Sequence, residues 1–158
     1  KDFHRWHDIR IEERRVVEAE QERLRKEKAK KEKEKLVSDF LIAAEKYLPL
    51  AEFAGDKHFA IFIARSPAEL VKEGNALSHC VGHNGYDKKM AREETLIFFV
   101  RKFDDLDTPF VTLEYSIKHK KILQCYAYDN QKPDDNVIEF VNKKWLPHAN
   151  EQLEKIAA

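Results

Sequence analysis

The chain has 158 residues, and its 29 acidic and 29 basic side chains give a formal net charge of zero. This length supports one domain with a hydrophobic core. The balanced charge argues against a surface that binds nucleic acid everywhere, although a local basic patch stays compatible with it. Two cysteines far apart in sequence indicate a reducing, cytoplasmic setting rather than a disulfide-stapled secreted fold. No apolar run approaches the ~20 residues that span a bilayer, so we expect no membrane partner.

Residues 1–48 form a charged segment that we predict to be helical and separate from a compact domain at 49–158. Neither glycine nor proline occurs between Ile9 and Leu48, and Glu, Lys, Arg, Ala and Leu dominate. Apolar residues thin out through the central Lys/Glu run, which predicts either one long helix or two helices joined near Lys35. The apolar spacing supports about two heptads, whereas a coiled coil needs three or four. A homodimer through this helix is therefore only a weakly supported alternative. Because the chain opens at Lys1 rather than Met, we expect a piece of a longer protein.

The compact part begins with a strand and a well-marked helix. The apolar run at 58–64 is typical of a buried strand. Ser66, Pro67 and Glu69 then occupy the N-cap, first and third positions of a capping box, which predicts a helix start. We expect this helix to end near Gly74 and a second short helix to occupy 86–92.

The rest of the chain predicts an antiparallel sheet and a final helix. Short loops separate three β-prone segments, which favours a meander. A last helix should begin near Asp134 with an apolar stripe that reaches Trp145, and Pro147 should kink or break it. The fold class is therefore α+β, with about four strands flanked by helices. The β-prone segments are residues 95–101, 110–117 and 122–128.

A glycine-rich stretch at 73–86 holds three of the four glycines together with His79, Cys80 and His83. Glycine serves where a backbone needs positive φ or a close approach, so reactive side chains among glycines suggest a site. Cys80 would act as a nucleophile if His79, His83 or a distant group served as its base. The alternatives are an inert buried cysteine and a zinc site made of His79, Cys80, His83 and Cys125. The second ligand pair typical of such a zinc site is missing, so we expect no cofactor.

Glu114 lies in the middle of a predicted strand, where alternation separates it from the apolar face. An even-length hairpin loop would place Cys125 across from Glu114, and an odd loop would bring Gln124 and Tyr126 to its face. Glu114 would then serve as a general base or as a ligand-orienting group. The alternative is a glutamate on a solvated sheet face, paired with Arg101.

Several motifs occur together in this order along the chain. They are the helix start Ser66–Leu70, the segment Glu73–Gly82 with its His-Cys-Val-Gly sequence, Tyr86, the strand start Glu94–Ile97, Arg101, the strand Pro109–Glu114, Gln124 and Asn130. In this combination, residues 58–145 resemble the PcfJ-like family of conjugative plasmids and phages. The chain departs from the family pattern at Arg92-Glu93, where relatives carry a glycine, and at Tyr126-Ala127, where they carry Arg-Gly. An arginine that is functional in relatives would make this chain a divergent or inactive member.

The resemblance implies a role in plasmid transfer or phage biology, with a nucleic-acid or protein partner bound in a pocket between the 79–86 loop and the polar strand face. One alternative is a hydrolase or transferase that uses cysteine, histidine and glutamate. Another is an interaction module that recruits its partner through the charged helix. The candidate catalytic residues are His79, Cys80, Glu114 and Gln124, and the candidate binding residues are Tyr86, Arg101, Tyr126 and Asn130.

Overall fold

The first 46 residues contribute one continuous helix. The computed structural model describes residues 2–158, and α1 runs over Asp2–Lys46 without the interruption near Lys35 that the Lys/Glu run left open. Good helix formers and pairs such as Arg23 with Glu27, 2.8 Å apart, support it throughout. Packing divides the chain into two units, Lys1–Lys35 and Leu36–Ala158. The domain boundary after residue 48 stays a prediction. The last turns of α1 already pack with the second unit, since Phe40 is buried there.

The second unit is built around a four-stranded antiparallel sheet in the order β1-β2-β3-β4, which confirms the predicted meander and the α+β class. Each strand pairs with the next one along the chain, so the connections stay short except between β1 and β2. The strands are β1 (Phe59–Ile63), β2 (Thr95–Lys102), β3 (Val111–Ser116) and β4 (Lys121–Tyr126).

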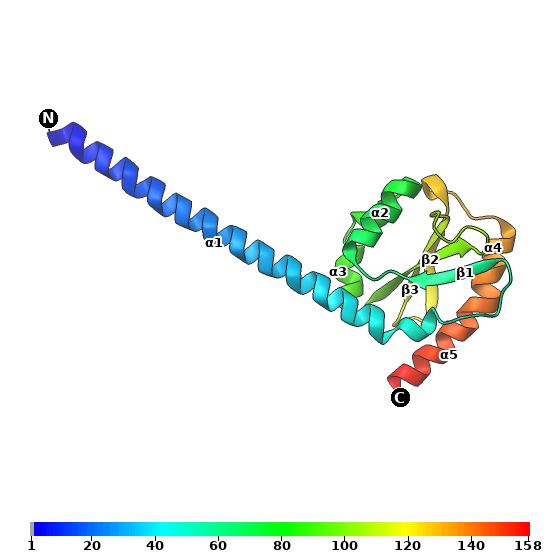
Figure 1. Ribbon diagram of the computed structural model, residues 1–158. Helices are drawn as coiled ribbons and strands as arrows, with labels where there is room; N and C mark the ends of the chain where they lie inside the picture. Colours follow the sequence, from blue (N-terminus) through cyan, green and yellow to red (C-terminus); the bar gives the residue numbers. More distant parts are fainter. Residues whose placement is uncertain (1) are drawn as a thin grey trace. The chain divides into compact units, whose positions relative to one another are not determined.

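Helices cover the two faces of the sheet in two groups, which Figure 1 shows on either side of the strands. The group between β1 and β2 lies on one face, and the group after β4 lies on the other. A single turn, η1 (Leu48–Leu50), joins α1 to the domain. The first group is α2 (Pro67–Leu77), η2 (Cys80–Gly82) and α3 (Tyr86–Ala91), and the second is α4 (Asp135–Glu139), η4 (Phe140–Trp145) and α5 (Leu146–Ala157). The short turn η3 (Tyr128–Asn130), which directly follows β4, contacts α2 and so belongs with the first group.

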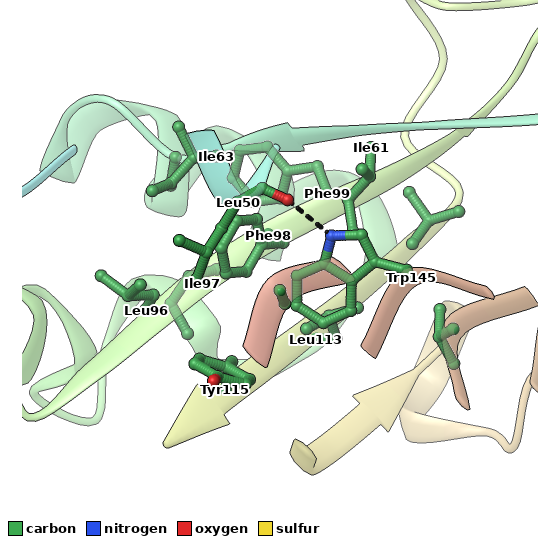
Figure 2. Close-up of a cluster of buried hydrophobic side chains, with 14 of the residues drawn as sticks. Leu50, Ile61, Ile63, Leu96, Ile97, Phe98, Phe99, Leu113, Tyr115 and Trp145 are labelled. Atoms are coloured by element: carbon green, nitrogen blue, oxygen red, sulfur yellow. Dashed lines mark hydrogen bonds between the residues drawn. The ribbon is translucent and has the colours of Figure 1, made fainter. Parts of the chain in front are cut away.

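The C-terminal group encloses the main core through Trp145. The indole ring centroid lies 4.8 Å from that of Phe98 and 5.7 Å from that of Tyr115, and its Nε1 donates to the carbonyl oxygen of Leu50 at 2.8 Å. Figure 2 shows this bond among the aliphatic side chains of the strands. Aromatic burial of this kind contributes much of a small domain's stability. Trp145 therefore ties the C-terminal helices and η1 to the same sheet face.

The final helix passes Pro147 without the predicted break. η4 is a π-helical segment, and α5 continues directly from it with Pro147 in its first turn. A wider π turn leaves the backbone carbonyls before a proline without the clash that a regular α-helix would create. The prediction of a break at Pro147 was therefore wrong, whereas a kink there stays a prediction.

The helix α2 starts as predicted and ends later than predicted. The hydroxyl of Ser66 accepts a hydrogen bond from the Glu69 backbone N–H at 3.2 Å, which confirms the N-cap. The helix then passes Gly74 and reaches Leu77, after which Ser78 adopts a left-handed conformation with φ of 51°. Gly74 is needed for packing rather than for termination, since an added Cβ would lie 2.9 Å from the carbonyl oxygen of His79.

Gly82 allows η2 to lie directly against α2. A Cβ added there would come 2.7 Å from the Cα of Val71 and 3.1 Å from the carbonyl oxygen of Leu70. Both neighbours are backbone atoms, so they cannot move aside as a flexible side chain could. The two glycines Gly74 and Gly82 thus hold the turn that carries His79 and Cys80 against the helix.

We expect Gly82→Ala to destabilise the domain by about 1–3 kcal/mol, because overpacking against backbone forces the turn away from α2. Urea unfolding at neutral pH measures the free energy of unfolding. The matched control is Gly85→Asn, since Gly85 has φ of 77° with no atom within 4 Å of an added Cβ, and asparagine tolerates this conformation. Equal stability losses in the two variants would contradict the close-packing argument.

Candidate functional site

A small cavity lies between η2, α3 and the strands β3 and β4. Its volume is about 30 Å³, which holds roughly two water molecules. A ligand larger than this could insert only a polar tip and would rest its body on the rim. The cavity is lined by His79, Cys80, Val81, Tyr86, Ile97, Thr112, Leu113, Glu114, Gln124, Tyr126 and Asn130.

The cavity floor carries a chain of hydrogen bonds. The Nε2 of Gln124 donates to Oε1 of Glu114 at 3.0 Å and to the hydroxyl of Tyr86 at 3.1 Å. These three residues come from β4, β3 and the first turn of α3. The chain holds the Glu114 carboxylate in one orientation, as a positioned acceptor requires.

A β-bulge decides that Gln124, rather than Cys125, faces Glu114. The hairpin loop at 117–120 has even length and pairs Ser116 with Lys121, a register that would place Leu123 across from Glu114. An irregularity between Glu114 and Tyr115 shifts the pairing by one residue, so that Glu114 pairs with Gln124. The expectation that loop length alone sets this face was wrong, because the bulge inserts an unpaired residue and reverses the alternation.

Glu114 is buried yet incompletely paired. Only 4% of the residue is exposed, which excludes the solvated-face alternative. Its second carboxylate oxygen, Oε2, has no hydrogen-bond partner among residues 2–158. Burying an acceptor without a partner costs about 1–3 kcal/mol. The oxygen is therefore poised to accept a hydrogen bond or a proton from a group that enters the cavity.

His79 uses both ring nitrogens within the protein. Its Nδ1 accepts a hydrogen bond from the backbone N–H of Val81 at 3.4 Å, so its Nε2 carries the proton and donates to the hydroxyl of Thr112 at 3.1 Å. Burial lowers the pKa of His79 from its usual value of 6.5. The histidine thus anchors η2 onto β3 in its neutral form.

Cys80 lies at the cavity, and the adjacent His79 does not serve as its base. The residue is exposed, and neither nitrogen of His79 contacts its thiol because both have other partners. A nucleophilic thiolate needs a neighbouring base or positive charge. Cys80 therefore lies exposed at the edge of the cavity, while His79 holds η2 against β3 through its hydrogen bonds.

The zinc alternative does not fit the structure. Cys125 pairs with Leu113 on the opposite sheet face from Glu114, where it packs against the core and burial raises the pKa of its thiol to about 12. No group of three or more His, Cys, Asp or Glu side chains able to hold a metal ion occurs within residues 2–158. The proposed set of His79, Cys80, His83 and Cys125 is therefore not assembled.

Arg101 belongs to a different part of the same sheet face. Its two terminal nitrogens bind the carboxylate of Glu73 in α2 at 2.7 and 2.6 Å, and the residue is 8% exposed. It therefore lies outside the cavity and does not pair with Glu114, as the alternative interpretation required. A buried bidentate pair of this kind holds α2 on the sheet.

The cavity rim combines aromatic rings with positive charge. Tyr126 lines the cavity and is exposed, as is Tyr128 in the same short helix as Asn130. The ammonium group of Lys89 lies 5.2 Å from the ring centroid of Tyr86. Tyr86 and Tyr126 line the cavity, while Lys89 contacts the Tyr86 ring from outside the lining. Aromatic and cationic groups of this kind suit a planar, partly anionic ligand.

The structure thus brings together seven of the eight candidate residues, all except Arg101, although their functional roles stay predictions. The candidate residues chosen from the sequence do not include Thr112, Glu73 and Lys89. Alternation along β3 does predict that Thr112 shares the face of Glu114, but it gives Thr112 no role. The pairing of Glu73 with Arg101 joins residues 28 positions apart and leaves no local signal.

Comparison with known proteins assigns the family. A family model described as PcfJ-like protein matches residues 1–141. The chain therefore belongs to the PcfJ-like protein family, as the motifs indicated. A protein of Listeria innocua serovar 6a named Uncharacterized protein Lin1253/Lin1744 is 36% identical over 85 residues, which cover 54% of this chain and 18% of that protein. No solved structure matches the chain.

The matched portion is less than a fifth of the Listeria protein, so the chain corresponds to one part of that longer relative. Within residues 2–158, no helix combines the length and the apolar character needed to cross a membrane.

We expect the stability contributed by His79 to fall as pH decreases. Because its folded-state pKa lies below the usual 6.5, the unfolded chain binds the proton more readily, and stability present above about pH 6.5 is lost as pH falls through the folded-state pKa. Urea unfolding from pH 7.5 to 5 should show the difference between wild type and His79→Asn shrinking toward low pH. Parallel pH profiles would contradict the burial of a neutral imidazole.

We also expect the two cysteines to differ sharply in alkylation. Iodoacetamide at pH 7.5 should modify the exposed Cys80 in the folded protein. Cys125 should react only after denaturation, because burial raises the pKa of its thiol to about 12. Peptide mass spectrometry identifies the modified site, and Cys80→Ser provides the control that should remain unmodified when folded. Modification of Cys125 in the folded control would contradict the observed face of β4.

Proposed function

We propose that this domain is a nucleic-acid-binding module of a mobile-element protein and that its cavity receives the edge of one base from a single strand. The unpaired Oε2 of Glu114 carries the proposal, because it is buried at the floor of the cavity with no donor of its own. A ligand that supplies this donor gains a charge-assisted hydrogen bond, which is about twice as strong as a neutral one.

The groups around Glu114 complement a nucleotide in three respects. The floor offers acceptors to the amino and imino groups of a base, and the exposed rings of Tyr126 and Tyr128 offer stacking surfaces. Lys89 stands on Tyr86 at the cavity wall, and the neighbouring Lys88 is exposed, so a phosphate behind the base would meet positive charge. The cavity volume of about 30 Å³ suits a base edge rather than a whole base.

A nucleic-acid ligand is favoured over a cationic protein side chain. An arginine or lysine tip would also pair with Glu114, but the ammonium group of Lys89 lies over the ring of Tyr86, a residue that lines the cavity. This positive charge disfavours a cationic ligand, because like charges repel. The association of the PcfJ-like family with plasmids and phages also supports a nucleic-acid partner.

The hydrolase or transferase alternative has one supporting observation, the exposed Cys80 at the cavity. Against it, His79 directs both nitrogens to Val81 and Thr112, so the adjacent histidine does not serve as a base for Cys80. The helix-recruitment alternative is weaker, because α1 has no continuous apolar stripe over Asp2–Lys46. The binding module therefore agrees best with the geometry.

We expect the full chain to bind fluorescein-labelled single-stranded DNA or RNA with an affinity that falls as salt rises, as measured by fluorescence anisotropy. Glu114→Gln should weaken this binding by about tenfold, since it removes the charge from the acceptor. Glu52→Gln, on an exposed residue outside the cavity lining, is the matched control and should bind as wild type.

Three results would contradict the proposal. The first is the absence of binding to any single strand at low salt. The second is equal binding by Glu114→Gln and wild type, both shown to be folded by circular dichroism. The third is preferential binding of arginine-rich peptides over nucleic acid, which would favour a protein partner.

A further inference from the structure

We propose further that the cavity selects among the bases and prefers guanine, with Glu114 and Gln124 as the discriminating residues. This inference rests on the proposed function, since it specifies which base edge enters the cavity. It follows from the hydrogen-bond capacity that the internal contacts leave unused.

The amide of Gln124 has only its acceptor left to offer. A side-chain amide has two N–H donors on one nitrogen and one carbonyl oxygen. Both donors of Gln124 are engaged, one with Oε1 of Glu114 at 3.0 Å and the other with the hydroxyl of Tyr86 at 3.1 Å. The remaining capacity of Gln124 is therefore that of an acceptor.

Glu114, Gln124 and Tyr86 together therefore offer two acceptors and one donor. Oε2 of Glu114 is unpaired and buried, and the carbonyl oxygen of Gln124 is a second acceptor. The hydroxyl of Tyr86 accepts from Gln124, so its own proton is left to donate. A matching ligand edge presents two neighbouring donors and one acceptor.

Guanine meets this requirement better than the other bases. Its Watson–Crick edge carries the N1 imino and N2 amino donors side by side, followed by the O6 acceptor. Adenine and cytosine each present a single amino group on that edge. Uracil and thymine present one imino group between two carbonyl oxygens, which would face the Glu114 carboxylate and be repelled by it.

The groups around the cavity, Tyr126 and Lys89, should strengthen the binding of every base equally and so should not contribute to the choice among bases. Stacking on Tyr126 needs only a ring face, and attraction to Lys89 needs only a phosphate. Selectivity therefore comes from the floor and overall affinity comes largely from the rim. Variants of the two regions should have different effects.

The test compares bases in two formats with the full chain. In one format GMP, AMP, CMP and UMP are titrated by isothermal calorimetry. In the other, oligouridine RNAs with one central G, A, C or U are titrated by fluorescence anisotropy. We expect guanine to bind at least about tenfold more tightly than uracil, as one well-formed set of base-edge hydrogen bonds provides. Selective binding of GMP would identify a free nucleotide as a ligand, and selectivity only among the oligomers would identify the strand.

The variants assign the selectivity to the floor. Glu114→Gln should reduce the difference between guanine and uracil to about twofold or less, whereas Lys89→Ala should weaken all bases by a similar factor. Tyr86→Phe, which removes only the donor to O6, should lower guanine selectivity partially and serves as a second test where Glu114→Gln fails to fold. Glu52→Gln is the control and should retain full selectivity.

The outcomes separate this inference from the proposed function. Equal affinity for all four bases, or a preference for uracil, would overturn guanine selection while leaving nucleic-acid binding intact. Unchanged selectivity in folded Glu114→Gln and Tyr86→Phe would also overturn it. The absence of any binding by the wild type would overturn the proposed function itself.

Discussion

The hydrogen bond between Gln124 and Glu114 across the bulged β3–β4 hairpin is the interaction on which the cavity depends. It holds one oxygen of a buried carboxylate at 3.0 Å from an amide and leaves the other without a partner. Without the bulge, the register set by Ser116 and Lys121 would place the apolar side chain of Leu123, rather than Gln124, across from Glu114. Bulges often re-aim side chains near functional sites, and this one changes the chemistry of the floor.

The two faces of the sheet serve different purposes. On one face, Trp145 packs against Phe98 and Tyr115 and binds the carbonyl oxygen of Leu50, which provides the core (Figure 2). On the other face, α2, η2 and α3 lie over a polar surface. Close packing at Gly82 brings η2 near enough for His79 to reach Thr112. The sheet face packed against Trp145 thus provides the core, while the opposite face holds polar side chains of which Glu114 keeps one oxygen without a hydrogen-bond partner.

That second face contains two buried glutamates with contrasting surroundings. Glu73 has both carboxylate oxygens paired with Arg101, an arrangement that fulfils its hydrogen-bonding needs within the protein. Glu114 has one oxygen paired with an amide and the other unpaired. A buried acceptor left unpaired reduces stability. Its retention beside exposed Tyr126 and the cation of Lys89 is explained if a ligand supplies the missing donor.

Local patterns in the sequence determined the helical character of the charged N-terminal segment, the Ser66 cap, the antiparallel meander and the glycine-rich turn that carries His79 and Cys80. These features depend on residues close together in the chain, where propensity, capping and alternation act. Only the tertiary structure decided that Gln124 faces Glu114, that Arg101 binds Glu73, that Cys125 faces the core and that Gly74 lies within α2. Each of these depends on a bulge or on packing between segments distant in sequence, and neither composition nor spacing specifies such contacts.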